Sequence, residues 1–292
     1  MTQTVFNRYE KKYLMTGPVY HALRARLAPH MQEDEYGLHT ICNLYYDTDD
    51  STLIRRSIEK PPYKEKLRIR SYGVPKEDGK VFLEIKKKYR KVVNKRRIAL
   101  PLTDAIALAN TGKLPSRIFF DNAALAEDPD RVRFETVQIL KELINFVKRY
   151  PLSRQTFLAY DRMALFGIHD GFRVTFDQNI RYRTKLVNPC LGDFGTQLLP
   201  ADCYLMETKV MGATPKWFSE ILSEMQIYPT SFSKYGNVYR KEIADFQYMD
   251  QMTHRIDNWK EIASCSQVYS TQVRFPSFTS HSHSLSRSYA AS

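Results

Sequence analysis

Apolar and cationic residues alternate in the segment YKEKLRIRSYG, residues 63–73. Leu67 and Ile69 fall on one parity of this segment. The other parity is cationic and consists of Lys66, Arg68 and Arg70. A period of two is the signature of a β-strand, whose successive side chains point to opposite faces of a sheet. We therefore expect a strand with one apolar face and one face lined by cations.

The same pattern recurs along the chain. Charges on alternate positions also mark FNRYEKKYLM, VFLEIKKKYRK, VVNKRRIAL, FRVTFDQNIRYR and YLMETKVMG. A solvated sheet face would explain one such strand. Like charges that face each other across strands destabilise a sheet, so several such strands need a compensating anion. A polyanion held among the strands would supply it.

About eight strands with few helices between them indicate an α+β protein. A closed barrel of this size ordinarily fills its interior with apolar side chains. Unpaired charges in that position would be costly to bury. The inward cations would need anions and the inward glutamates would need cations, and a complex of metal ion and polyphosphate would satisfy both.

The formal net charge of +12 over 292 residues also indicates an acidic partner, namely nucleic acid, an anionic membrane or phosphorylated small molecules. The chain has no apolar run of membrane-spanning length and no signal-peptide pattern at its start, so a cytoplasmic location is expected. The cysteines are scattered and are expected to be unpaired: Cys42, Cys190, Cys203 and Cys265.

Two regions are expected along the chain. Residues 1–243 are densely patterned and predict one domain, whereas residues 244–292 are rich in Ser and Thr and predict a disordered tail. Helical spacing and end signals predict helices within residues 16–31, 102–112, 133–151 and 213–227. Thr214 is the expected N-cap of the last of these helices, and Thr103 or Asp104 that of the second.

Nine segments in order carry a resemblance to a known family: RYEKKYL, NLYYDT, YKEKLRIRSYG, VFLEIKKKY, KRRIAL, YDRMALFG, FRVTFDQNIRYR, METKV and FSKYGNVY. Together they resemble the triphosphate tunnel metalloenzymes, also called CYTH-like proteins. Within that group the chain looks most like the VTC-type polyphosphate polymerase domain, in its stand-alone bacterial form.

The resemblance implies an antiparallel eight-stranded β-barrel tunnel with flanking helices. It implies transfer of the γ-phosphate of ATP onto a growing inorganic polyphosphate chain, assisted by Mn²⁺ or Mg²⁺. The catalytic residues it implies are Lys12, Arg68, Arg70, Lys86 and Arg162. The substrate-binding residues it implies are Lys95, Arg97, Arg173, Lys209, Ser233 and Lys234. Glu207 is the implied metal ligand, and Glu10 and Glu84 are candidate second ligands or neutralise neighbouring lysines.

Two positions depart from the family pattern. Hydrolytic relatives open with alternating Glu-x-Glu-x-Lys, but here Arg8 stands in place of the first Glu, before Glu10 and Lys12. One carboxylate is thereby lost and one cation gained, which favours a longer polyanion. Ser231 stands where some members of the family have Lys.

Two other functions remain open on this evidence. One is hydrolysis of inorganic triphosphate or a nucleoside triphosphate by the same fold. The other is non-enzymatic binding of polyphosphate or RNA, although carboxylates among the cations disfavour a specific nucleic-acid partner. Several nearby residues have plainer expected roles: Lys64, Lys66, Lys87 and Lys91 as solvated lysines, Tyr45, Tyr46, Tyr235 and Tyr239 in packing, Asp47 and Asp49 in turns. Metal preference and oligomeric state are left open.

Overall fold

A computed structural model describes residues 9–90, 92–119, 129–169, 171–210 and 212–242. Residues 1–241 form one compact unit, and residues 242–292 are assigned to a second. Arg8, Lys91, Cys265 and the predicted disordered tail lie outside the described residues. Among the helices described, none is long and apolar enough to cross a membrane.

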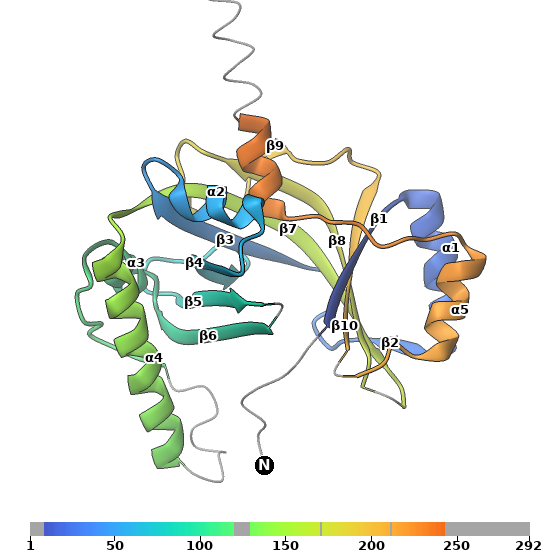
Figure 1. The fold of residues 1–292 in the computed structure, drawn as a ribbon, viewed down its shortest axis with the longest axis horizontal. Coiled ribbons are helices and arrows are strands. Elements are labelled where there is room, and N and C mark those ends of the chain that lie inside the picture. Colours follow the sequence, from blue (N-terminus) through green and yellow to red (C-terminus); the bar gives the residue numbers. More distant parts are fainter. Residues whose placement is uncertain (1–8, 91, 120–128, 170, 211, 243–292) are drawn as a thin grey trace, which may run out of the picture. The chain divides into compact units, whose positions relative to one another are not determined.

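One antiparallel sheet of ten strands organises the first unit (Figure 1). Eight strands follow the order β1-β10-β8-β7-β3-β4-β5-β6, and the short β2 and β9 pair with β7 and β8. Their bounds are β1 Tyr9–Thr16, β2 Met31–Glu33, β3 His39–Thr48, β4 Tyr63–Tyr72, β5 Lys80–Tyr89, β6 Val92–Pro101, β7 Leu152–Gly167, β8 Arg173–Arg183, β9 Thr196–Gln197 and β10 Cys203–Val210.

The predicted closed barrel of eight strands is wrong in both count and closure. β2 and β9 have only three and two residues, too few to produce a period-two pattern in the sequence. Over the described residues, β1 and β6 end the strand order and do not pair with each other. The sheet is thus open between β1 and β6. A side-chain ion pair spans this open edge, since Lys86 Nζ on β5 lies 3.7 Å from Glu10 Oε2 on β1.

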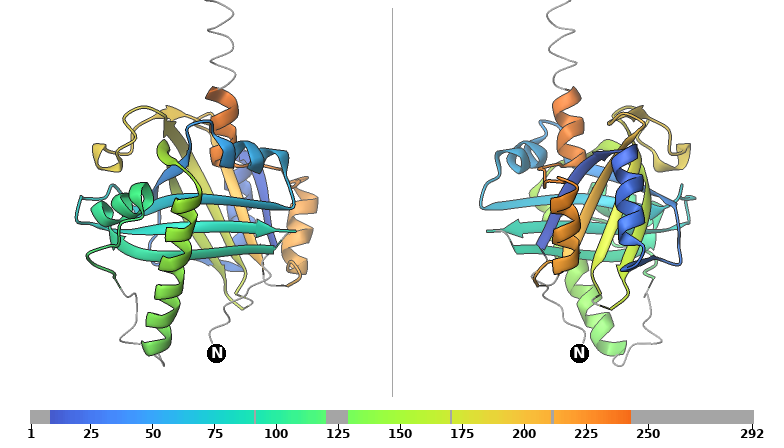
Figure 2. Two further views of the ribbon diagram at one scale, coloured as in Figure 1. Left: turned by 60° about the vertical axis from the view of Figure 1, so that its left-hand side comes forward. Right: turned by 90° about the vertical axis from the view of Figure 1, so that its right-hand side faces the viewer.

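Helices cover the apolar faces of the two halves of the sheet (Figure 2). α3 (Leu102–Thr111) and α4 (Pro129–Arg149) pack over β4, β5 and β6, where Leu67, Leu83 and Leu100 are fully buried. α1 (Gly17–Leu27) and α5 (Lys216–Glu224) pack over β1, β10 and β8. The opposite face of these strands, which we call the inner face, carries the charged residues.

The four predicted helices are present, but two predicted N-caps are wrong. α3 begins after Pro101 and α5 after Pro215, and neither N-cap makes a side-chain hydrogen bond. Proline has a fixed φ suited to a helix start, so it sets the boundary there without a polar cap. Asp104 lies inside α3 and accepts hydrogen bonds from the backbone N–H groups of Ser116 and Arg117, both at 3.0 Å.

An additional helix, α2 (Thr52–Glu59), follows β3. The fully buried Asp47 carboxylate accepts hydrogen bonds from the backbone N–H groups of Leu53 at 2.8 Å and Ile54 at 2.9 Å. The Tyr235 hydroxyl donates to the same carboxylate at 3.1 Å. Asp47 therefore lies within β3 and joins α2 to residues 234–241, which are helical, so it acts as a buried acceptor rather than as the predicted turn residue.

A third apolar cluster fills part of the inner face. Tyr45 stacks on Tyr235 with ring centroids 4.5 Å apart, and Leu158, Leu205 and Val238 belong to the same cluster. The predicted packing role of Tyr45, Tyr46 and Tyr235 is thereby confirmed, since all three are buried. The cysteines in the described residues, Cys42, Cys190 and Cys203, are unpaired, as expected.

Candidate phosphate-binding site

Three lysines stand in a row across the inner face. Lys66 on β4 is the register partner of Lys86 on β5, and Lys86 is in turn the partner of Lys95 on β6. Directly opposed like charges destabilise a sheet by up to about 1 kcal/mol per pair. A row of this kind is therefore costly unless an anion lies over it.

The neighbouring row carries Arg68, Glu84 and Arg97. Arg68 Nε and NH2 both lie 2.8 Å from Glu84 Oε2, and Lys95 Nζ lies 2.6 Å from Oε1. Burial opposes ionisation of Glu84, but Arg68, Arg70 and Lys95 hold its pKa well below the usual range. Glu84 thus neutralises its neighbours, which was the plainer of its two predicted roles.

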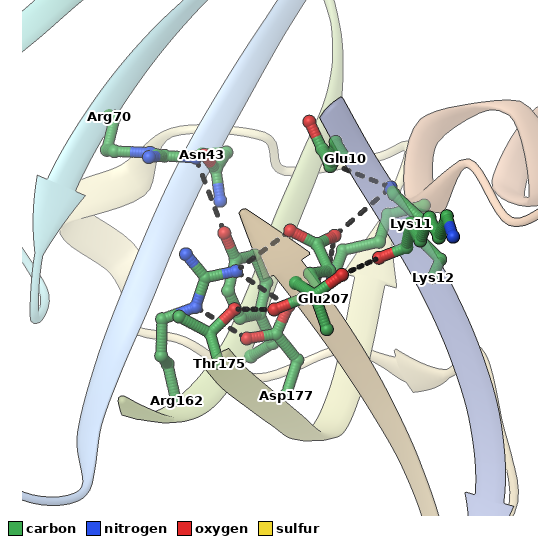
Figure 3. Close-up of polar contacts among 12 residues, drawn as sticks. Glu10, Lys11, Lys12, Asn43, Arg70, Arg162, Thr175, Asp177 and Glu207 are labelled. Carbon is green, nitrogen blue, oxygen red and sulfur yellow. Dashed lines mark hydrogen bonds and ion pairs between the residues drawn. The ribbon is translucent and has the colours of Figure 1, made fainter. Parts of the chain in front are cut away.

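Arg70 connects this half of the site to the other. Its Nε donates to Asn43 Oδ1 at 3.1 Å, and its NH2 donates to the Tyr160 hydroxyl at 3.4 Å (Figure 3 shows Arg70 with Asn43). The guanidinium of Arg162 and the ammonium of Lys234 lie over the same Tyr160 ring, 5.2 and 4.5 Å from its centroid. Tyr160 therefore lies between the two groups of cations.

Asp177 organises the second half of the site. Its carboxylate is fully buried and accepts from Arg162 Nε at 2.6 Å and from Arg162 NH2 at 2.8 Å (Figure 3). Lys234 Nζ donates to the same carboxylate. Burial disfavours the charged form of Asp177, but Arg162 and Lys234 lower its pKa. We did not predict this residue, although its parity with Arg173 and Thr175 in the sequence marks it as inward-facing.

Glu207 lies next to this group on β10. Its Oε1 lies 3.1 Å from Lys12 Nζ and 3.2 Å from Lys234 Nζ, and its Oε2 lies 3.5 Å from Arg162 NH2. Burial opposes ionisation, but these three cations hold the pKa of Glu207 well below the usual range. Glu10 shares the Lys12 ammonium, at 3.7 Å, so two of the three glutamates predicted to bind metal are brought together.

Within the described residues, no three His, Cys, Asp or Glu side chains form a metal cage. Glu84 lies with Arg68 and Lys95, so only Glu10 and Glu207 meet at Lys12. Mg²⁺ is commonly held by one or two carboxylates together with substrate phosphate oxygens. Two hard oxygen donors beside a cationic surface fit this mode, so the residues present suit Mg²⁺ or Mn²⁺ bound together with a phosphate ligand.

Ser233 and Lys234 lie at the start of the helical residues 234–241. Ser233 Oγ accepts from the backbone N–H of Gly236 at 3.2 Å and so caps this helix. The Lys66 ammonium donates to the same oxygen at 3.4 Å. The predicted pair therefore reaches the inner face, but Lys234 is already paired with Asp177 and Glu207.

Lys66 is partly buried, not solvated as predicted. Among the described residues, no carboxylate oxygen lies within 4.0 Å of its ammonium, and burial together with Lys86, Lys64, Lys12 and Arg68 lowers its pKa to about 7. Lys64 donates to the carbonyl of Ser57 and Lys87 pairs with Glu142, so both have protein partners. Lys66 is thus surrounded by other cations and belongs to the candidate site, although the sequence pattern did not mark it as a site residue.

Three other residues predicted to bind substrate, Lys209, Arg173 and Arg97, lie nearer the edge of the inner face. Lys209 is the register partner of both Glu10 and Arg173. Burial and the nearby Arg162 lower the pKa of Lys209 to about 8. The Arg173 side chain is 43% exposed, lies over the Phe166 ring and is 3.9 Å from Asp34. Arg97 stacks on Phe82, with 4.4 Å between the guanidinium carbon and the ring centroid.

Two arginines that extend the sequence pattern lie outside the site. Arg183 donates to the carbonyls of Leu186, Asn188 and Phe194 and lies 3.6 Å from the centroid of the Phe157 ring. Arg181 is paired with Asp161 and Asp193. Both hold the segment that follows β8 and are already satisfied by protein groups.

The inner face of the described residues has an excess of positive charge. Its cations include Lys12, Lys66, Arg68, Arg70, Lys86, Lys95, Arg162, Lys209 and Lys234. Its carboxylates are Glu10, Glu84, Asp177 and Glu207. With every lysine protonated, these nine cations and four carboxylates leave a formal excess of about five positive charges, which favours binding of an external anion.

Comparison with solved structures found distant likenesses. A proposed adenylate cyclase from Bacillus halodurans has 16% identity, covers 79% of this chain and 96% of its own, and gives a TM-score of 0.46. A proposed adenylyl cyclase from Hippeastrum with a dominant triphosphatase activity has 18% identity, covers 80% and 95%, and also gives 0.46. A proposed adenylate cyclase from Vibrio parahaemolyticus has 10% identity, covers 81% and 99%, and gives 0.41. TM-scores below 0.5 carry no conclusion about this chain.

No curated protein matches the sequence. A family model described as the VTC domain matches residues 7–242. The matched region contains every strand of the sheet and every residue of the inner face described above. Because the match covers most of the chain and agrees with the resemblance carried by its motifs, the protein belongs to the VTC domain family.

Proposed function

We propose that the protein is a metal-dependent polyphosphate polymerase that transfers the γ-phosphate of ATP onto a growing polyphosphate chain along the inner face. The lysine row of β4, β5 and β6 is the observation that carries the proposal. Opposed lysines and an excess of positive charge suit a ligand with one negative charge per phosphate. The VTC domain family membership supports the same substrate class.

The residues would divide the work as follows. Arg68 and Arg70 would hold successive phosphates, since a guanidinium fork binds phosphate oxygens in a bidentate manner. Lys12, Lys86 and Arg162 would neutralise charge on the reacting phosphates, and Lys66 would hold a phosphate beside Ser233. Phosphoryl transfer depends mainly on such positioning and charge neutralisation. The accepting terminal phosphate is largely ionised at neutral pH, so no strong general base is required.

Glu207 and Glu10 would hold Mg²⁺ or Mn²⁺ together with phosphate oxygens. When bound, the ion supplies charge neutralisation on the phosphate oxygens and on the leaving group. The pKa of Glu207 lies well below its usual range, so the carboxylate is ionised and ready to act as a ligand across the physiological pH range. Lys12, which lies 3.1 Å from its Oε1 in the protein alone, would turn to phosphate, while Lys234 stays paired with Asp177.

Incubation of the purified protein with ATP and Mn²⁺, with the products resolved by gel electrophoresis and ³¹P NMR, tests the proposal. A ladder of phosphate chains with ADP is the expected result. Release of orthophosphate without phosphate chains would instead indicate that the protein is a triphosphatase. The Glu207→Gln variant should lose turnover. If neither the unmodified protein nor this variant turns over ATP, and both bind polyphosphate equally well, the protein is a binding module.

A further inference from the structure

Three aromatic rings continue the charged rows of the inner face. They are His39 on β3, Tyr72 on β4 and Phe82 on β5, which are neighbouring strands. The ring centroids of His39 and Tyr72 are 6.0 Å apart, and those of Tyr72 and Phe82 are 5.9 Å apart. By strand alternation, Tyr72 shares a face with Arg70, and Phe82 shares a face with Glu84. The rings therefore line the same surface as the proposed phosphate site.

Packing of the protein core does not account for these rings. None of the three belongs to the hydrophobic clusters of the described residues, which lie against the helices or around Tyr235. Tyr72 is 56% exposed, and His39 is partly exposed. Only Phe82 is buried, beneath the guanidinium of Arg97. The exposed Tyr72 ring therefore offers an accessible aromatic surface on the basic inner face.

The rings adjoin the arginines that would bind phosphate. Phe82 is the register partner of Arg70, so their β-carbons lie about 5 Å apart. Tyr72 follows Arg70 by two residues on the same face, which places it about 7 Å farther along β4. A ring at this separation is within reach of a base joined through ribose to phosphates on Arg68 and Arg70.

We propose that the Tyr72 ring forms a platform that stacks the base of the nucleoside triphosphate donor, with His39, whose ring plane is tilted by 52° to that of Tyr72, at the edge of the platform. This inference rests on the proposed function, because it takes the triphosphate to lie on Arg68 and Arg70. Every base has a π-face, so the platform would accept different bases and would bind purines more tightly than pyrimidines. His39 Nδ1 lies 3.0 Å from the Gly37 carbonyl, which can only accept, so Nε2 of the neutral ring keeps an acceptor for an exocyclic amine.

Two ligands that each carry a triphosphate-like chain, one with a nucleoside and one without, isolate the platform. Binding of the β,γ-imido analogue of ATP and of tripolyphosphate, each with Mg²⁺, would be measured by titration calorimetry. Tyr72→Ala should lower affinity for the ATP analogue by about 5- to 100-fold, the range of one base–aromatic stack. Tripolyphosphate affinity should stay within about twofold, and Tyr72→Phe, which keeps the ring, should bind both ligands like the unmodified protein.

Tyr228→Ala is the matched control, because Tyr228 is 71% exposed and outside the row of rings. It should change neither affinity. Unchanged binding of the ATP analogue to both Tyr72→Ala and His39→Ala would overturn the platform, and so would an equal loss for both ligands. Arg68→Ala should weaken the binding of both ligands. If it weakens neither, or if the unmodified protein binds neither, the phosphate site itself is wrong.

Discussion

Arg162 and Asp177 are joined across β7 and β8 by two parallel hydrogen bonds, of 2.6 and 2.8 Å, with Asp177 completely buried. Lys234 reaches the same carboxylate from another part of the chain. Asp177 therefore fixes two cations of the inner face in place before any substrate binds. Through the two cations that it holds, Asp177 determines the geometry of the site.

Asp177→Asn should destabilise the protein by about 3 kcal/mol, because Arg162 and Lys234 lose their shared buried counterion. Urea unfolding measures the change. Saturating tripolyphosphate should stabilise this variant more than the unmodified protein, since the ligand supplies the missing negative charge. Asp50→Asn is the control: Asp50 pairs with Arg55 at an exposed position, 62% accessible, and its loss should cost much less stability than the loss of Asp177. Equal stability of the two variants would contradict the role of Asp177.

Arg68→Lys should weaken tripolyphosphate binding by roughly tenfold, or about 1.4 kcal/mol, because an ammonium cannot replace a fork that binds two oxygens. Arg68 also uses its fork on Glu84 and donates to the Tyr45 hydroxyl at 3.0 Å, so its orientation is set in advance. Titration calorimetry measures the affinity. Arg55→Lys, at an exposed position on α2 where Arg55 pairs with Asp50, should bind as the unmodified protein does. Undiminished binding to Arg68→Lys would show that charge alone suffices there.

Binding of tripolyphosphate at pH 8 should draw protons onto the protein. The pKa of Lys66 is about 7, so this side chain is mostly neutral at pH 8 in the free protein. The groups around it are Lys12, Lys64, Lys86 and Arg68, with Ser233 as its hydrogen-bond partner, and none of them is anionic. A phosphate beside Lys66 favours its charged form and raises its pKa, so a proton is taken up.

Calorimetric titrations in two buffers with different ionisation enthalpies would measure this proton uptake. Lys66→Met should reduce it but not remove it, because the pKa values of Lys95 and Lys209, about 7 and about 8, are also lowered by burial. Lys113→Met, at an exposed position after α3, should leave the uptake unchanged. A binding enthalpy that does not depend on the buffer would refute a ligand beside Lys66.

Arg183→Met should lower stability and leave phosphate binding intact. Three carbonyls, those of Leu186, Asn188 and Phe194, would lose a charged donor, at a cost of at least about 2 kcal/mol. The melting temperature and the tripolyphosphate affinity would be measured on the same preparation. A normal melting temperature with weakened binding would place Arg183 in the site, contrary to its contacts.

Local sequence pattern determined the strands and their two faces. Leu67 and Ile69 alternate with Lys66, Arg68 and Arg70 because a strand presents successive side chains to opposite sides, and this needs no knowledge of the partner strand. The motifs likewise identified the family and the inward arginines and lysines. The end of α4 was also predictable, since Pro151 cannot continue a helix.

Only the tertiary structure decided which charges are neutralised. Arg162, Arg181 and Arg183 look alike in the sequence, but Arg162 pairs with Asp177, Arg181 pairs with Asp193, and Arg183 donates to three carbonyls of the segment that follows β8. The same holds for Lys66, whose lack of a carboxylate depends on the register of β4 with β5 and on the place of Ser233. Parity is a local property of the backbone. The choice of partners, the open edge between β1 and β6 and the rings beside Arg70 depend on how distant strands align, which no single segment encodes.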